Sequence, residues 1–251
     1  MLTQTLIDST KPIQLFRSAL RLQQSILAGP EKRLLIWIAE RTPSWIHPDH
    51  LTTFGFLAQL MTGVSYALAR SSQLGLTGAI VFLILNWFGD SMDGTLARVR
   101  QQQRPRYGFY VDHMLDSIGA VALMSGLALS GYMSPMIAIA LLVLFLLLSI
   151  QSYLATYALG EFRMSFWSLG PTELRLFLIL GNLAACRWPM VVKGYRLFDV
   201  GGAIGIAGMS LILLWFTGRN IVRLYDEERL HDIARSLNTV RTLAAEPTPR
   251  Y

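Results

Sequence analysis

Long apolar runs without a single charged residue dominate the pattern of this chain. Four such runs occupy residues 51–69, 71–89, 117–160 and 200–218. A helix needs about 20 apolar residues to cross the hydrocarbon core of a bilayer. The third run is long enough for two helices, which a turn at residues 131–135 would separate. The pattern therefore predicts five transmembrane helices.

A sixth span is predicted from a run that is interrupted by charge near its two ends. Residues 174–192 are apolar but contain Arg175 and Arg187. Long arginine side chains at the ends of a span can extend to the membrane interface. We therefore expect an all-α integral membrane protein with six transmembrane helices.

The segments on either side of the spans are more polar. Before the first span, apolar residues alternate with basic and polar ones at helical spacing, which predicts one or two amphipathic helices on the membrane surface, with a break at Gly29-Pro30. A charged helix over residues 219–235 is expected to follow the last span. The predicted parts are an interfacial segment of residues 1–49, a six-helix transmembrane domain of residues 50–218, and a cytoplasmic helix and tail of residues 219–251.

Composition and charge agree with a membrane protein. Hydrophobic residues make up 53% of the chain and charged residues only 15%, which is atypical of a soluble domain. The net charge is +6, and basic residues gather before the first span, between the second and third, and after the last. The positive-inside rule places these three regions, and both termini, in the cytoplasm. Because the positive charge borders spans, it gives no support to a nucleic-acid-binding role.

Four aspartates lie where the second span meets the basic loop and the third span begins. Asp90 and Asp93 are three residues apart, and Asp112 and Asp116 are four apart, so each pair shares one face of its helix. The short loop between them predicts that the two helices are antiparallel neighbours and that the pairs meet across their interface. Without a cation, four adjacent carboxylates would repel one another, and an ionised group in hydrocarbon is costly.

This clustering of hard oxygen ligands predicts a site for Mg²⁺, Mn²⁺ or Ca²⁺. Two ions suit bridging carboxylates, and paired ions about 4 Å apart assist displacement at phosphorus. Arg98 offers a planar donor fork suited to phosphate. Gly94 leaves the backbone beside Asp93 open to a ligand, and the small side chain of Ala97, one turn after Asp93, leaves room on the same face of the helix. Gly108 is expected to let the two helices approach closely.

The spacing of these residues is that of a known signature. The chain reads Asp90-x-x-Asp93-Gly94-x-x-Ala97-Arg98, followed by Gly108-x-x-x-Asp112-x-x-x-Asp116. This closely resembles the motif of the CDP-alcohol phosphotransferases, also called CDP-alcohol phosphatidyltransferases. These are membrane enzymes with a six-helix core that make phospholipid and related head groups and release CMP. The loop before Gly108 is one residue longer here than is usual in the family.

The resemblance implies roles for each motif residue. Asp90, Asp93 and Asp112 would bind two divalent cations, Mg²⁺ or Mn²⁺. Asp116 would bind metal, act as the base that deprotonates the acceptor hydroxyl, or do both. The CDP group would lie against the remaining motif residues, Gly94, Ala97, Arg98 and Gly108. The family also implies a homodimer, with its active site facing the cytoplasm in this chain.

Two further features bear on the substrates. His113, with Thr172-Glu173 later in the chain, is similar to the choline/ethanolamine phosphotransferase branch, where the histidine is a candidate base; capping or packing between helices is the alternative. The segment from Pro48 to Thr52 is similar to the family's Pro-Asn-x-x-Thr, with Asp49 in place of Asn. The donor is either CDP-diacylglycerol with a small polar acceptor or a CDP-aminoalcohol with a lipid acceptor, and His113 and Glu173 favour the second.

Two alternatives stay open. Intramembrane acids also mark ion pathways, so an ion-coupled transporter is the alternative function. Such proteins usually show inverted repeats or broken helices near the midplane, and the sequence shows neither. Arg100, Arg104 and Arg106 in the basic loop serve either as an orientation signal or as contacts for an anionic head group or substrate.

Overall fold

Helices account for nearly all of the described chain. The computed structural model describes residues 20–22, 28–163, 171–190, 194–229 and 235. Its helices are α1 (Ala28–Arg41), α2 (Pro48–Ala69), α3 (Leu74–Val99), α4 (Pro105–Leu129), α5 (Pro135–Leu159), α6 (Pro171–Arg187) and α7 (Leu197–Glu227). One parallel pair of three-residue strands, β1 (Leu20–Leu22) and β2 (Glu161–Arg163), accompanies them. Apart from this short pair, the described residues have the expected helical architecture.

Proline and glycine mark where several helices start and stop. Pro48, Pro105, Pro135 and Pro171 are the first residues of α2, α4, α5 and α6. Proline suits this position because its fixed φ is helical and its missing N–H has no partner there anyway. Gly160 ends α5 with a φ of 68°, a left-handed conformation that favours glycine.

Four helices are long and apolar enough to cross a membrane: α2, α3, α5 and α7. The other two expected spans differ from these in identifiable ways. α4 carries Arg106, Asp112 and Asp116, and α6 has 17 residues. The count of six spans therefore stays a prediction. The charged helix expected from residue 219 is the continuation of the last span, because α7 runs unbroken to Glu227.

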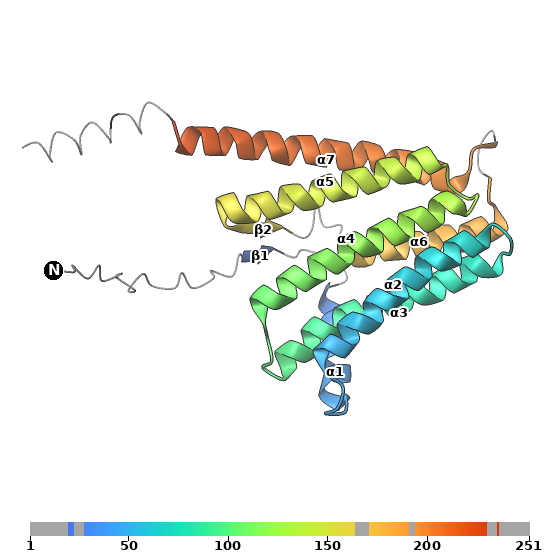
Figure 1. The fold of residues 1–251 in the computed structure, drawn as a ribbon, viewed down its shortest axis with the longest axis horizontal. Helices are drawn as coiled ribbons and strands as arrows, with labels where there is room; N and C mark the ends of the chain where they lie inside the picture. The colour runs from blue at the N-terminus through green and yellow to red at the C-terminus, as the bar shows by residue number, and fades with distance from the viewer. Residues whose placement is uncertain (1–19, 23–27, 164–170, 191–193, 230–234, 236–251) are drawn as a thin grey trace, which may run out of the picture.

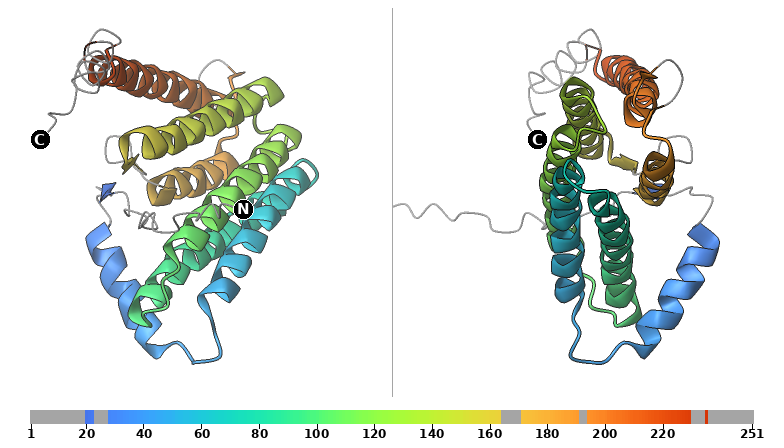
Figure 2. Two further views of the ribbon diagram at one scale, coloured as in Figure 1. Left: turned by 60° about the vertical axis from the view of Figure 1, so that its left-hand side comes forward. Right: turned by 90° about the vertical axis from the view of Figure 1, so that its right-hand side faces the viewer.

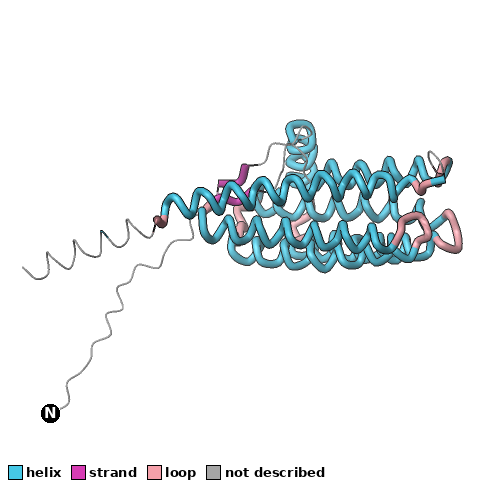
Figure 3. Tube along the Cα trace, turned by 90° about the horizontal axis from the view of Figure 1, so that it is seen from above, coloured by secondary structure: helices cyan, strands magenta, loops and turns pink. Residues whose placement is uncertain are grey.

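The long helices run in one broad direction, and α1 crosses it (Figures 1 and 3). α2 packs along both α3 and α4, α5 packs against α4 and α7, and α6 contacts α3 and α7. Figure 2 shows α2, α3 and α4 as one group and α5 and α7 as another. We call these the α2–α4 group and the α5–α7 pair.

The expected direct contact between α3 and α4 is wrong. These helices, described over their full lengths, make no close backbone contact with each other, because α2 packs against both. Gly108 accordingly does not sit at a helix–helix contact: a Cβ atom built on it would meet nothing within 4 Å. A short loop implies that the two helices it joins are antiparallel. It does not determine whether they pack against each other or against a third helix that lies between them.

Glycines elsewhere make the close approaches. A Cβ atom on Gly89 would lie 2.6 Å from the Cα atom of Gly55, so α2 and α3 meet backbone to backbone there. Gly63 and Gly126 bring α2 and α4 together in the same way. Small residues at helix interfaces are typical of membrane proteins, where close packing replaces the hydrophobic drive. The first contact also fixes the position of Asp90, the residue after Gly89.

The main apolar core lies at the opposite end of these helices from the aspartates. It surrounds Tyr66, whose hydroxyl accepts a 2.9 Å hydrogen bond from Nδ2 of Asn182, and both side chains are fully buried. Buried residues on several helices contribute, among them Leu76 and Leu83 of α3 and Leu127 of α4. The core therefore holds one end of the bundle together and leaves the other end for polar groups.

A second, smaller cluster attaches α1 to α3. Leu35 and Ala39 of α1 are buried against Met92 and Leu96 of α3. On the opposite side of α1, Trp37 is exposed, as expected of an amphipathic helix. The helix begins at residue 28, so Gly29-Pro30 lies in its first turn and marks a helix start. Its contact with a membrane surface stays a prediction, and any helix before residue 20 lies outside the described residues.

Candidate active site

One pocket collects all four aspartates at the end of the bundle where α2 begins, α3 ends and α4 begins. Asp90 and Asp93 line it from α3, and Asp112 and Asp116 line it from α4. The side facing them is formed by α2, which contributes Thr52 and three other residues. The two acidic pairs therefore face the same pocket. They lie beside α2, which packs against both helices, and not at a direct α3–α4 interface.

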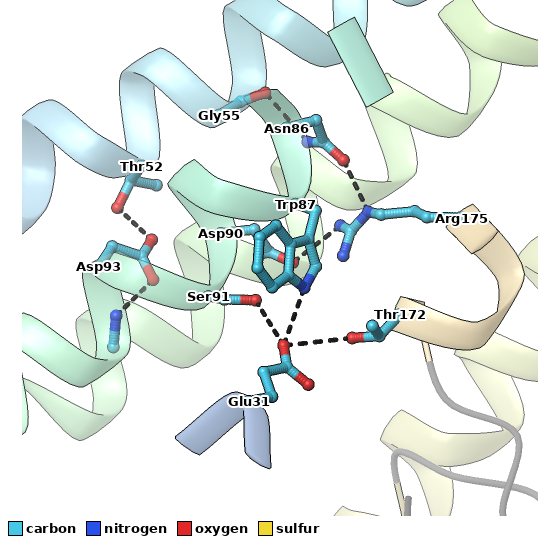
Figure 4. A network of polar contacts seen from close by, with 11 residues as sticks. Glu31, Thr52, Gly55, Asn86, Trp87, Asp90, Ser91, Asp93, Thr172 and Arg175 are labelled. Carbon is cyan, nitrogen blue, oxygen red and sulfur yellow. Dashed lines mark hydrogen bonds and ion pairs between the residues drawn. The ribbon is translucent and has the colours of Figure 1, made fainter. Parts of the chain in front are cut away.

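A threonine of α2 holds Asp93 in place. The Thr52 hydroxyl donates a 2.6 Å hydrogen bond to Oδ2 of Asp93, and the backbone N–H of Gly94 donates to Oδ1 (Figure 4). Both carboxylate oxygens thus have a donor, so the orientation of the group is set by two helices. Thr52 is the last residue of the Pro48–Thr52 segment noted in the sequence, and it lies inside the pocket that the motif forms.

An arginine from α6 reaches Asp90. Nη2 of Arg175 lies 2.8 Å from Oδ2 of Asp90, and its Nε donates a 2.7 Å hydrogen bond to Oδ1 of Asn86. Asn86 in turn donates from Nδ2 to the Gly55 carbonyl, at 3.0 Å. Arg175 is thus a member of the site and not only a span-end residue that extends to the interface. Its positive charge offsets part of the negative charge of the aspartates.

A carboxylate of α1 links three helices beside the turn of α3 that carries Asp90. Oε1 of Glu31, in α1, accepts hydrogen bonds from Nε1 of Trp87 at 2.8 Å and from Oγ of Ser91 at 3.1 Å. Oγ1 of Thr172, in α6, lies 3.5 Å away, at the limit of a hydrogen bond. Trp87 and Ser91 lie on either side of Asp90 in the sequence, so Glu31 links α1 to the turn that carries this aspartate (Figure 4).

The residues expected to bind the nucleotide lie beside the pocket. Arg98 folds back along its own helix: its Nη2 donates to Oγ1 of Thr95 at 3.0 Å, and its Nη1 would lie 3.3 Å from a Cβ atom on Gly94. Ala97 is half-buried on the same helix, and the space around Gly108 is open. These four positions flank the aspartates without lining their pocket.

His113 points elsewhere. Its ring centroid lies 4.3 Å from that of Phe109 and 5.1 Å from that of Tyr153, and its Nδ1 contacts the Phe109 carbonyl. The residue is not among those that line the aspartate pocket. This placement favours the packing role for His113 over the role of base. Glu173, the other residue taken to indicate the choline/ethanolamine branch, is buried near the start of α6.

Two arginines of the basic loop have structural partners. Arg100 donates hydrogen bonds to the carbonyls of Thr42, Pro43 and Ile46, and so ties the end of α3 to the connection between α1 and α2. Arg104 forms an ion pair with Asp49 at the surface, and the hydrogen bond between them raises the pKa of the arginine. Asp49 therefore serves the loop structure here.

The donor set fits hard divalent cations. Carboxylate oxygens from four aspartates face one pocket, and Mg²⁺ and Mn²⁺ prefer such ligands. In the described part of the chain, no three His, Cys, Asp or Glu side chains converge closely enough to form a finished metal site. Asp90 is turned toward Arg175 and Asp93 toward Thr52. Side-chain rotation within the pocket would therefore accompany binding of a cation.

Comparison with known protein families matches the region of the chain that contains this site. Residues 45–219 match the profile of the CDP-alcohol phosphatidyltransferase family, which covers more than half of the 251-residue chain. The chain belongs to this family. The matched region contains α2 to α6 and most of α7, with every motif residue. Curated proteins give no match to this chain.

Membership of the CDP-alcohol phosphatidyltransferase family, together with four helices able to span a bilayer, identifies an integral membrane protein. The family consists of transferases that move a phosphoalcohol group from a CDP-alcohol in lipid synthesis. α1 precedes the matched region, so Glu31 and its contacts with α3 and α6 are features outside the family profile.

Sequence reasoning missed several residues of the site. The sequence places Arg175 only at the end of a span, and it gives no role to Asn86 and Gln59, which line the pocket. A signal was available, because side chains with amide groups are uncommon inside apolar runs and find polar partners when they occur there.

Proposed function

We propose that this protein transfers a phosphoalcohol or phosphatidyl group from a CDP-alcohol to the hydroxyl of an acceptor alcohol, with release of CMP. We further propose that the reaction requires two divalent cations, Mg²⁺ or Mn²⁺, and takes place at the cytoplasmic side of the membrane in a homodimer. The observation that carries the proposal is that the four acidic positions of the family motif line one pocket.

The metal and nucleotide roles follow from the motif positions. Asp90, Asp93 and Asp112 would hold the cations, together with Asp116. When bound, the cations supply positive charge that neutralises the pyrophosphate in the transition state. Arg98 would turn from Thr95 toward a phosphate of the nucleotide, which would lie against Gly94, Ala97 and the open space at Gly108.

Asp116 is the proposed base. It would take the proton of the acceptor hydroxyl while the acceptor oxygen forms a bond to the phosphorus that carries the alcohol. The bond from that phosphorus to the bridging oxygen breaks, and CMP leaves with the electron pair. His113 is left with a packing role in this proposal because its ring lies between Phe109 and Tyr153.

Both substrate pairings agree with this chemistry. One combines CDP-diacylglycerol with a small polar acceptor, and the other combines a CDP-aminoalcohol with a lipid acceptor. The sequence features that favoured the second pairing were His113 and Glu173. Since His113 does not line the aspartate pocket, its support for that pairing is reduced.

A CMP-release assay on the purified full-length protein tests the proposal. CDP-diacylglycerol, CDP-choline and CDP-ethanolamine would each be offered with matching acceptors, with Mg²⁺ or Mn²⁺ and with EDTA. We expect CMP release that EDTA abolishes and that Asp112→Asn and Asp116→Asn reduce by about 100-fold or more. Asp226→Asn is the matched control, because Asp226 lies near the end of α7 and its ion pair within the described residues is with the surface residue Arg229.

Binding measurements separate the remaining outcomes. A folded protein that binds neither Mn²⁺ nor CDP would contradict the proposal and return the ion-coupled transporter to first place. CMP release that persists in EDTA would contradict the metal requirement alone. Loss of activity in His113→Ala with full activity in Asp116→Asn would move the role of base to the histidine.

A further inference from the structure

One buried oxygen in the aspartate pocket has no hydrogen-bond partner. Among the described residues, the buried side-chain polar atoms without a partner are Oε1 of Gln59 and Oδ1 of Asn182. Asn182 lies in the apolar core, where its Nδ2 donates to Tyr66. Gln59 lines the same pocket as the four aspartates. A buried carbonyl oxygen without a donor is destabilising, so a group of this kind inside a pocket points to a ligand.

The structure makes room for the Gln59 side chain in particular. A Cβ atom on Gly119 of α4 would lie 2.6 Å from Cγ of Gln59, so the glycine provides the space that this side chain fills. Gly119 follows Asp116 by three residues and therefore shares its face of α4. α4 runs from the pocket toward the apolar core, so Gln59 lies one helical turn deeper in the bundle than Asp116.

The other uncharged polar side chains that line this pocket are already engaged. Asn86 donates to the Gly55 carbonyl and accepts from Arg175, and Thr52 donates to Asp93. The Oε1 atom of Gln59 can only accept a hydrogen bond. A ligand in this pocket can therefore satisfy Gln59 if it brings an O–H or N–H group to the deep side of Asp116.

The reacting hydroxyl cannot satisfy both residues. In the proposed function its single proton goes to Asp116, so none is left to donate to Gln59. We infer that Gln59 is a specificity residue of the acceptor subsite and selects acceptors that carry a second hydrogen-bond donor beside the reacting hydroxyl. This inference rests on the proposed function and on its assignment of Asp116 as the base.

The inference divides the two substrate pairings. Small polyols and aminoalcohols have a neighbouring O–H or N–H that can donate to Gln59. In a 1,2-diacylglycerol the neighbouring oxygens are esters, which have no proton to donate. Gln59 therefore favours a small polar acceptor with CDP-diacylglycerol as the donor, contrary to the preference that His113 and Glu173 gave at the level of sequence.

Acceptors that differ by one donor group provide the test. Glycerol 3-phosphate would be compared with 3-hydroxypropyl phosphate, and serine with 3-hydroxypropionate, each with CDP-diacylglycerol and Mg²⁺ or Mn²⁺. For at least one pair, we expect the wild type to favour the complete acceptor by about 10- to 100-fold in kcat/KM, the range for leaving one buried polar group without its partner. Gln59→Met should remove this preference and leave the KM of the donor unchanged.

Gly119→Ala is the second variant, in case Gln59→Met folds poorly. It keeps the amide but forces it out of its space, so we expect the same loss of preference with an intact Gln59. Thermal unfolding in detergent would show that each variant is folded.

The outcomes separate this inference from the proposed function. Equal loss on both members of a pair, or a wild type that does not distinguish them, would overturn the inference. Activity with diacylglycerol and a CDP-aminoalcohol, but with no small polar acceptor, would also overturn the inference. In each of these cases CMP release would still support the proposed reaction class. No CMP from any pairing would overturn the proposed function and this inference with it.

Discussion

The α2–α4 group and the α5–α7 pair are both built from long helices but are held together differently. α2, α3 and α4 have seven, nine and four buried residues, whereas α5 and α7 have three each although their lengths, 25 and 31 residues, are similar or greater. Glycines bring the backbones of the α2–α4 group into contact, whereas nearly all side chains of the α5–α7 pair are exposed or half-buried. The first region carries the carboxylates of the pocket, and none of the residues that line the pocket belongs to the second.

This difference follows from the solvent. Lipid tails solvate apolar side chains as well as another helix does, so apolar helices gain little from close packing with each other. Helices that present charged groups to a shared pocket gain from exact placement, because a misplaced carboxylate is left without a partner. Equivalent substitutions in the two regions should therefore have unequal effects.

The largest contrast is expected between two glycines. Gly89→Val would place side-chain atoms against the backbone of α2 and push Asp90 away from the pocket. We expect CMP release to fall by about 100-fold or more, with a destabilisation of about 1–3 kcal/mol. Gly201→Val on α7, where a Cβ atom meets nothing within 4 Å, is the matched control and should stay near wild type. Equal effects of the two substitutions on kcat and on thermal unfolding would refute the contrast.

A smaller effect is expected from the arginines. Arg175→Ala leaves Asp90 and Asn86 without a shared partner, and we expect kcat/KM to fall by about 5- to 30-fold, since the ion pair is partly open to solvent. Arg223→Ala on α7 removes an exposed pair with Glu227 and should change kcat/KM less than about twofold. An Arg175→Ala protein that binds Mn²⁺ more tightly and turns over faster would show instead that the arginine competes with the cation for Asp90.

Two threonines give a matched pair with an effect that is smaller again. Thr52→Val removes the hydroxyl that orients Asp93, and we expect about a 3- to 10-fold loss of kcat, near 1 kcal/mol for one hydrogen bond. Thr156→Val removes a hydroxyl that, among the described residues, donates to the carbonyl of Ser152 within α5, and should be neutral. The contrast is measured as the ratio of kcat values at saturating Mg²⁺, and a ratio near one would contradict the role of Thr52.

The smallest effect belongs to the outward face of the α5–α7 pair. Leu214 of α7 is 71% exposed, so Leu214→Ala removes little protein contact. We expect a change in the free energy of unfolding of less than about 0.5 kcal/mol and unchanged CMP release. A large loss in lipid vesicles but not in detergent would reveal an unexpected contact between this face and another protomer or a bound lipid.

The sequence predicted the helices and the meeting of the acidic pairs because both depend on local spacing. Apolar runs define where helices lie, and intervals of three and four place Asp90 with Asp93 and Asp112 with Asp116 on common faces. What it could not predict was the helix that fills the space between them. α2 takes this place because of glycines, such as Gly55, that carry no signal in a hydropathy pattern.

The partners of the aspartates were also beyond local reasoning. Arg175 and Asp90 are separated by 85 residues, and the motif does not indicate which basic side chain pairs with an aspartate. His113 shows the reverse error, because its position next to Asp112 in the chain suggested a role at the site. On a helix, adjacent residues point to different sides, and the ring of His113 accordingly packs against Tyr153 of α5.

The contact between Arg175 and Asp90 has a consequence for biosynthesis. All eight motif residues have been synthesised by residue 116, but their cationic partner belongs to α6 and leaves the ribosome much later. During that interval Arg175 is not yet available to Asp90, and Thr172 is not yet available to Glu31, 141 positions away. The acidic turn that carries Asp90 is therefore expected to gain this ion pair only when α6 docks, which makes insertion of that helix a late step in assembling the site.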